Sequence, residues 1–162
     1  MGKSIRNLST VTRVGLDLAK RVFQVHAVDA KGEIVVASKL TRSQLIPFFA
    51  ELPPCVVAME ACSSAHHWGR ALIELRHEVR LIPPAHVKPY VRSNKSDQVD
   101  AAAIYEAMSR PGQRFVPVRS IDNQAELMRH RARALLAGQR TVALNALRGP
   151  LAEIGVVGPQ GV

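Results

Sequence analysis

The stretch RVGLDLAKRVFQVHAVDAKGEIVVAS, residues 13–38, decides the fold class. Residues 13–18 are apolar and β-prone, and residues 22–28 alternate with the period of two that is typical of a strand. A turn is expected at DAKG, where Gly32 can adopt a positive φ, and residues 33–38 form a third strand. The stretch therefore predicts three consecutive strands in an antiparallel meander.

Helices and short strands are expected to alternate after this meander. Thr41 and Gln44 have the spacing of a capping box at a helix start, and the continuous apolar run after residue 54 is typical of a strand buried on both faces. The expected elements are helices over 41–51, 64–77, 84–91 and 97–109 and strands over 55–59 and 79–82. Three strands followed by helix, strand, helix, strand and helix are the order of the ribonuclease H-like α/β fold, a mixed sheet flanked by helices.

Residues 121–148 have the pattern of one long helix. Met128, Leu135 and Val142 recur every seven residues, which fits either a coiled-coil arm or an amphipathic helix that packs on its own domain. Residues 110–150 hold eight arginines, no lysine and two acidic residues. Guanidinium groups bind phosphates bidentately, so this segment is expected to bind nucleic acid. Its candidate contacts are Arg129, Arg131, Arg133 and Arg140.

The composition also points to a globular protein with a polyanionic partner. Hydrophobic residues make up 47% of the 162, which is enough for a core, and the formal net charge is +9. Such an excess favours nucleic acid as the partner over a merely basic soluble protein. The two cysteines lack the spacing of a zinc site, and no apolar run approaches the roughly 18 residues that span a bilayer. A cytoplasmic protein without a membrane partner is expected.

Four carboxylates stand at positions that suggest chemistry. Asp17 lies in the first strand, Glu60 ends the fourth, and Asp97 and Asp100 begin a helix three residues apart, on one face. Carboxylates from strand ends and a helix start can converge on divalent metals, which clamp the attacking and leaving oxygens of a phosphodiester. The structural alternatives are a helix cap for Asp97, an exposed first turn for Asp100, and a solvent-facing edge strand for the other two acids.

These residues also carry a family resemblance. The motifs GLDLAK at residues 15–20, MEAC at 59–62 and NKSDQVDAA at 94–102 resemble those of the DEDD transposases of the insertion-sequence 110 family. The resemblance extends from about residue 13 to the end of the chain. It implies a RuvC-like domain in which Asp17, Glu60, Asp97 and Asp100 are the catalytic tetrad and bind Mg²⁺, with Mn²⁺ as the other candidate.

The resemblance implies further parts and partners. These are a coiled-coil region after the acidic domain, a second, C-terminal domain that carries a serine for strand exchange, DNA, a structured guide RNA and a homo-oligomeric assembly. The family chain is about twice this length, so this one is expected to be incomplete and inactive alone in recombination. The expected domains are residues 11–112 (RuvC-like), 113–150 (arginine-rich helical arm) and 151–162 (a linker toward the missing domain).

Three other functions are alternatives to transposition. A catalytically inert module for nucleic-acid binding and oligomerisation needs the basic surface but no metal, and a Holliday-junction resolvase would use the same acids. An actin-like or sugar-kinase ATPase half is disfavoured because the phosphate-binding Gly/Thr run is absent after Asp17. In the favoured interpretation four cations near the acids are candidates for guiding a nucleic-acid backbone. They are Lys20, Lys88, Arg92 and Lys95.

Overall fold

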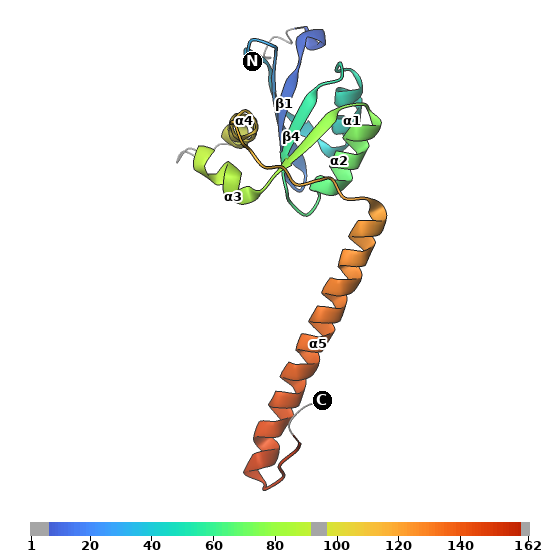
Figure 1. Ribbon diagram of the computed structural model, residues 1–162, viewed down its shortest axis with the longest axis vertical. Helices are drawn as coiled ribbons and strands as arrows, with labels where there is room; N and C mark the ends of the chain where they lie inside the picture. Colours follow the sequence, from blue (N-terminus) through green and yellow to red (C-terminus); the bar gives the residue numbers. More distant parts are fainter. Residues whose placement is uncertain (1–6, 92–96, 160–162) are drawn as a thin grey trace. The chain divides into compact units, whose positions relative to one another are not determined.

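A five-stranded mixed sheet with the strand order β3-β2-β1-β4-β5 organises the N-terminal part of the computed structural model (Figure 1). The structure describes residues 7–91 and 97–159, without the side chains of residues 97–99. The chain divides into two compact units, Met1–Val118 and Arg119–Val162. The sheet and its helices form the first unit, and one long helix with a short tail forms the second.

The sheet combines the predicted meander with two parallel strands. The first three strands pair antiparallel in sequence order, whereas β4 is parallel to β1 and β5 is parallel to β4. The strands are β1 (Arg13–Leu18), β2 (Val22–Val28), β3 (Ile34–Thr41), β4 (Val56–Glu60) and β5 (Glu78–Ile82). Strand β3 extends three residues beyond its predicted end, because Val22 of β2 pairs with Thr41 and the whole of β2 is used.

Helices are present at all four predicted places in the first unit, but the one predicted over 84–91 is divided into two short helices, and a short helix that was not predicted precedes the sheet. In chain order, the helices of this unit are η1 (Leu8–Thr10), α1 (Arg42–Ala50), α2 (Ala65–Glu74), α3 (Pro84–Val87), η2 (Lys88–Tyr90) and α4 (Asp97–Met108). The predicted capping box is present at α1, where the backbone N–H of Thr41 donates to Oε1 of Gln44 at 2.9 Å. Helix α2 ends before its predicted residue 77, because Arg76 adopts a left-handed backbone with φ of 68° and reverses the chain.

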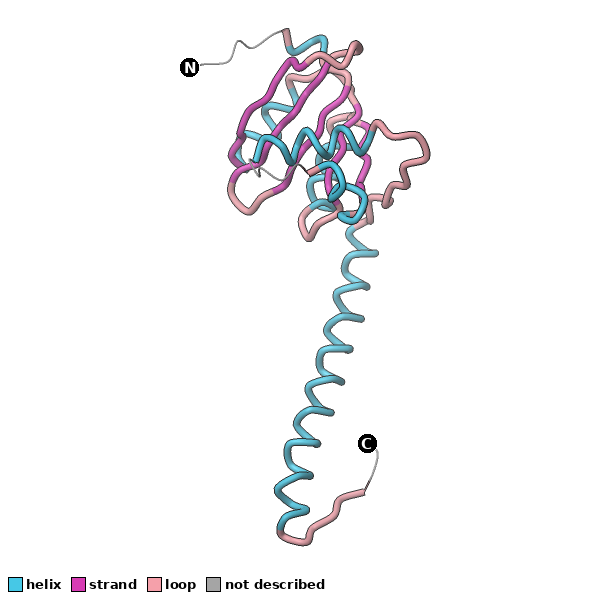
Figure 2. The backbone as a smooth tube through the Cα atoms, turned by 90° about the vertical axis from the view of Figure 1, so that its left-hand side faces the viewer, coloured by secondary structure: helices cyan, strands magenta, loops and turns pink. Residues whose placement is uncertain are grey.

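Two hydrophobic layers cover the two faces of the sheet. Helices α1 and α2 lie on one face and α3 and α4 on the other (Figure 1), and Figure 2 views the sheet from the side of α4, which crosses the strands. The α1/α2 layer contains large side chains such as Phe23, Phe49 and Trp68. The α4 layer combines the small side chains of Ala58, Ala103 and Ala107 with larger ones such as Ile82 and Ile104. The small side chains let α4 approach the strands closely.

The second unit consists of α5 (Ile121–Glu153) and the residues after it. The hydroxyl of Ser120 caps its start by accepting the backbone N–H of Asn123 at 3.1 Å. The helix passes through Pro150 and ends beyond the predicted residue 148, since a proline in the last turn removes only one main-chain hydrogen bond. The mixed sheet flanked by helices and the long C-terminal helix are thus both confirmed. No described helix has the length and apolar character needed to cross a membrane.

Candidate active site and nucleic-acid surface

Two of the predicted acids occupy the same edge of the sheet. Strands β1 and β4 are adjacent and parallel, and their last register pair is Leu16 with Met59. Asp17 and Glu60 each follow this pair directly, so both stand where neighbouring parallel strands end. Both residues are partly buried. The sheet therefore brings together two carboxylates that are 43 positions apart in the sequence.

The same two acids face α4. Leu16 and Met59 belong to the hydrophobic layer under α1 and α2, whereas Ala58 belongs to the layer under α4. Successive strand side chains point to opposite faces of a sheet. Asp17 and Glu60 therefore lie on the face of the sheet that α4 covers. Helix α4 is also the element that carries the other two predicted acids.

A glycine in β1 sets how closely α4 approaches. A Cβ atom placed on Gly15 would overlap with the carbonyl oxygen of Ala101 and would lie 3.0 Å from the backbone nitrogen of Tyr105. No side chain larger than hydrogen fits there unless the helix backbone moves. The contact places the first turns of α4, which include Asp100, directly over β1.

The proximity of Glu60 and Asp100 has an electrostatic consequence. Burial raises the pKa of the Glu60 carboxyl above its ordinary value, and the negative charge of Asp100 raises it further. A carboxyl whose ionisation is opposed by a neighbouring carboxylate is common where a cation can bind between the two groups. The structure thus places Glu60 and Asp100 within electrostatic reach although they lie on different elements.

Gln24 is a further candidate site residue, which the sequence patterns did not single out. It pairs with Asp17 across the antiparallel β1–β2 ladder, so the two side chains share a face. Its side chain is 3% exposed, and its buried Oε1 accepts no hydrogen bond from any described residue. A buried amide oxygen without a donor costs about 1–3 kcal/mol, so it suggests a partner from outside the described chain. The period-two pattern placed Gln24 on this face, but the missing partner has no signature in sequence.

The structure leaves the predicted tetrad partly undescribed. Asp97 is the first residue of α4, but its side chain lies outside the described residues. Within the described part of the chain, no group of three histidine, cysteine, aspartate or glutamate side chains is arranged to hold a metal ion. The pair of Glu60 and Asp100, with Asp17 on the neighbouring strand, therefore forms the described part of the acidic site. The tetrad as a metal site stays a prediction.

The predicted cations around the acids lie in different places. Lys20 is exposed in the turn between β1 and β2, three residues after Asp17, and Lys88 is exposed at the start of η2. Arg92 and Lys95 fall outside the described residues. Their roles in binding a nucleic-acid backbone stay predictions.

Three of the four predicted arginines on α5 share one side of the helix. Arg129, Arg133 and Arg140 line a common open groove with Leu136. Arg131 is absent from this groove because a residue two positions along a helix faces away from its neighbour. Arg129 also contacts Glu126, with Nη1 3.0 Å from Oε2.

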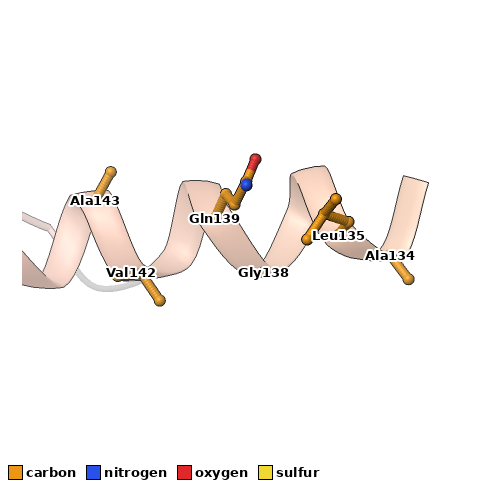
Figure 3. A pocket seen from close by; sticks show the side chains of 6 residues that line it. All are labelled: Ala134, Leu135, Gly138, Gln139, Val142 and Ala143. Atoms are coloured by element: carbon orange, nitrogen blue, oxygen red, sulfur yellow. The ribbon is translucent and has the colours of Figure 1, made fainter. Parts of the chain in front are cut away.

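A second, apolar groove lies along α5. Leu135 and Val142 are 61% and 70% exposed, and Gly138 leaves a gap between them, where an added Cβ would meet nothing within 4 Å. Figure 3 shows that the lining comes from consecutive turns of the helix; the residues are Ala134, Leu135, Gly138, Gln139, Val142 and Ala143. The helix therefore presents an arginine-bearing side and an apolar side.

Comparison with known proteins gives a consistent result. The chain matches the family model of the DEDD transposases of the insertion-sequence 110 type, described as a transposase, over residues 14–156. It is 54% identical over 147 residues to a "Probable family 20 transposase" of Pseudomonas aeruginosa, a match that covers 91% of this chain and 44% of that protein. It is 42% identical over 155 residues to the transposase for insertion sequence element IS1328 of Yersinia enterocolitica, covering 96% of this chain and 46% of the relative. It is 38% identical over 159 residues to the transposase for insertion sequence element IS1111A of Coxiella burnetii, covering 98% and 44%. The chain thus spans less than half the length of these curated relatives.

Proposed function

Because this chain belongs to the insertion-sequence 110 family of DEDD transposases, we propose that its first unit is a metal-dependent DNA-processing domain with a ribonuclease H-like, RuvC-like architecture. The observation that supports this most directly is the juxtaposition of Glu60 and Asp100 at the end of β4, under the start of α4. The function is cleavage or transfer of DNA phosphodiesters in transposition.

The residues present fit a hard divalent cation. Asp17, Glu60 and Asp100 offer carboxylate oxygens, and the unpartnered Oε1 of Gln24 offers a neutral oxygen beside Asp17. Mg²⁺ or Mn²⁺ is proposed to be held by the three acids and Asp97, and it would polarise the phosphodiester and activate its attacking oxygen. Because the pKa of the Glu60 carboxyl is raised, protons compete with a cation for this carboxyl at higher pH than they would at an ordinary glutamate.

The second unit is proposed to hold nucleic acid and to join copies of the chain. Arg129, Arg133 and Arg140 present guanidinium groups along one side of α5, which suits the phosphates of DNA or of a structured guide RNA. The apolar side around Leu135 and Val142 suits a coiled-coil contact in a homo-oligomer, because a single helix cannot cover that side itself.

A second candidate function is a catalytically inert module for nucleic-acid binding and assembly. It is favoured by the absence, in the described residues, of a third ligand grouped with Glu60 and Asp100. Such a module would use the arginines of α5 and its apolar side in the same way and would not need a metal.

Calorimetric titration with Mg²⁺ or Mn²⁺ separates the two candidates. Wild type is compared with the Asp17→Asn/Asp97→Asn double variant, and the fluorescence of the single tryptophan, Trp68, checks that both chains are folded. Saturable binding that the double variant loses supports the metal-dependent domain. An absence of binding by wild type, with nucleic-acid binding retained, supports the inert module and contradicts the first proposal.

A further inference from the structure

A basic recess of the first unit lies at the opposite end of the sheet from the acids. Arg13, Arg80 and Arg110 line one recess of about 390 Å³, with Val56, Met108, Ser109 and Pro111 as the other lining residues. Arg13 begins β1, Arg80 lies in β5, and Arg110 follows the end of α4. Three separate elements therefore bring three guanidinium groups to one place.

Each of the three guanidinium groups lies over an aromatic ring. The Cζ atom of Arg13 is 5.7 Å from the centroid of Tyr105, that of Arg80 is 5.2 Å from Phe115, and that of Arg110 is 5.1 Å from Tyr90. Stacking on a ring orients the plane of a guanidinium and leaves its N–H edge available for an anion. The aromatic contacts therefore reduce the conformational entropy lost when these side chains bind a ligand.

The charge in the recess is only partly neutralised. Nε of Arg80 is 2.7 Å from Oε1 of Glu78. Among the described residues, neither Arg13 nor Arg110 has a carboxylate within salt-bridge distance. Arg110 follows the C-terminal end of α4, where a cation also interacts favourably with the helix dipole, but that interaction does not account for Arg13. The recess thus retains positive charge for an anionic ligand.

The recess lies on the same face of the sheet as the acids. Arg13 and Asp17 are four residues apart in β1 and point to the same face, about 13 Å apart along the strand. Asp100 and Arg110 are separated by about 15 Å along α4 and its continuation. Phosphates of one DNA strand advance about 3.4 Å per nucleotide along the helix axis. The separation therefore corresponds to about four nucleotide steps.

From this geometry we infer that the Arg13–Arg80–Arg110 recess binds backbone phosphates of the DNA whose reacting phosphodiester lies at the acidic site, about four nucleotides away. This inference rests on the proposed function. The recess would fix the position of the DNA along the α4 face, and because it contacts phosphates, it would do so without reading the bases.

The test is the salt dependence of DNA binding by the full chain in EDTA. Binding is measured as the fluorescence anisotropy of a labelled duplex. For the Arg13→Gln/Arg110→Gln variant, the negative slope of log K against log salt is expected to become shallower by about 1.8, because two phosphate contacts are lost. The control is Lys31→Gln/Arg114→Gln, which removes the same charge at exposed positions outside the recess and should leave the slope near that of wild type.

Two further measurements keep the outcomes separate. If Trp68 fluorescence shows that the double variant is unfolded, the exposed Arg110→Gln change alone is used. Its slope is expected to be shallower than that of wild type by about 0.9. Equal slopes for the recess and control pairs, or no binding of DNA by wild type, would overturn the inference. Metal titration of the same proteins reports on the proposed function independently. If wild type binds Mg²⁺ but the recess variant keeps the wild-type slope, the proposed function is supported and the recess inference fails. If wild type does not bind Mg²⁺ but the recess variant shows the reduced slope, the recess inference is supported and the metal-dependent function is not.

Discussion

The carbonyl oxygen of Ala101 lies against Gly15 so closely that a Cβ on the glycine would overlap with it. Asp100 precedes Ala101 in α4, and Asp17 lies two residues beyond Gly15 on the same face of β1. The contact between the α4 backbone and Gly15 therefore determines how far Asp100 lies above Asp17. It explains in physical terms why the motif around Asp17 includes a glycine.

Replacing Gly15 with alanine is expected to destabilise the first unit by about 1–3 kcal/mol, the usual cost of overpacking. The matched control is Gly138→Ala in α5, where the added Cβ meets nothing and helix propensity improves by about 1 kcal/mol. Urea unfolding followed by Trp68 fluorescence reports on the first unit. A Gly15→Ala midpoint equal to that of wild type would show that α4 can move away from the sheet without cost.

Glu60→Gln is expected to make the first unit more stable at neutral pH. The folded-state pKa of Glu60 is raised, so its ionisation opposes folding, and this loss of stability develops as pH rises from the ordinary glutamate value through the folded value. Since Glu60 is only partly buried, the gain should be at most about 0.5 kcal/mol, and it should vanish at acid pH. Urea unfolding across a pH series measures it.

The Asp100→Asn background provides the control for this effect. Asp100 is the second cause of the raised pKa, so its neutralisation should reduce the gain from Glu60→Gln but should not abolish it, because burial remains. A gain of the same size in both backgrounds would show that the two carboxylates do not interact.

The elements of the first unit were predictable because each has a strong local pattern. Alternation identified β2, the capping box identified the start of α1, and a short apolar run identified β4. The ends of elements depended on tertiary structure. Strand β3 continues to Thr41 because β2 offers it partners, and α2 stops where Arg76 takes a left-handed conformation that a sequence pattern does not predict.

The candidate site was only partly visible in the sequence. The acids stood out because a charge in an apolar strand is costly unless it has a partner. Gln24 did not stand out, since a glutamine in an alternating strand is ordinary until its burial and its unpartnered Oε1 are known. The recess of Arg13, Arg80 and Arg110 depends on contacts among three distant segments, so no sequence spacing indicates it.

Gln24→Met is expected to leave the stability of the metal-free protein unchanged or to raise it by about 1 kcal/mol, because the variant removes a buried oxygen without losing a hydrogen bond to a described residue. The same variant should bind Mg²⁺ more weakly, since a thioether is a poor ligand for a hard cation. Gln44→Met is the control, and it should lower stability by about 1 kcal/mol because Oε1 of Gln44 accepts the Thr41 N–H. Destabilisation by Gln24→Met of the size seen for Gln44→Met would show that the Gln24 amide already has a partner.

The apolar side of α5 is expected to hold copies of the chain together. Leu135→Gln with Val142→Gln should raise the dissociation constant at least about tenfold, because both side chains are exposed in the single chain and lie on the same apolar groove. Leu136→Gln with Leu147→Gln is the matched control: those side chains are 63% and 62% exposed, but Leu136 lines the arginine-bearing groove instead. Sedimentation equilibrium across a concentration series measures both pairs. An equal loss of association in the two variants would show that the contact is not confined to the apolar side of α5. A wild-type chain that stays monomeric would contradict the prediction that α5 joins copies of the chain.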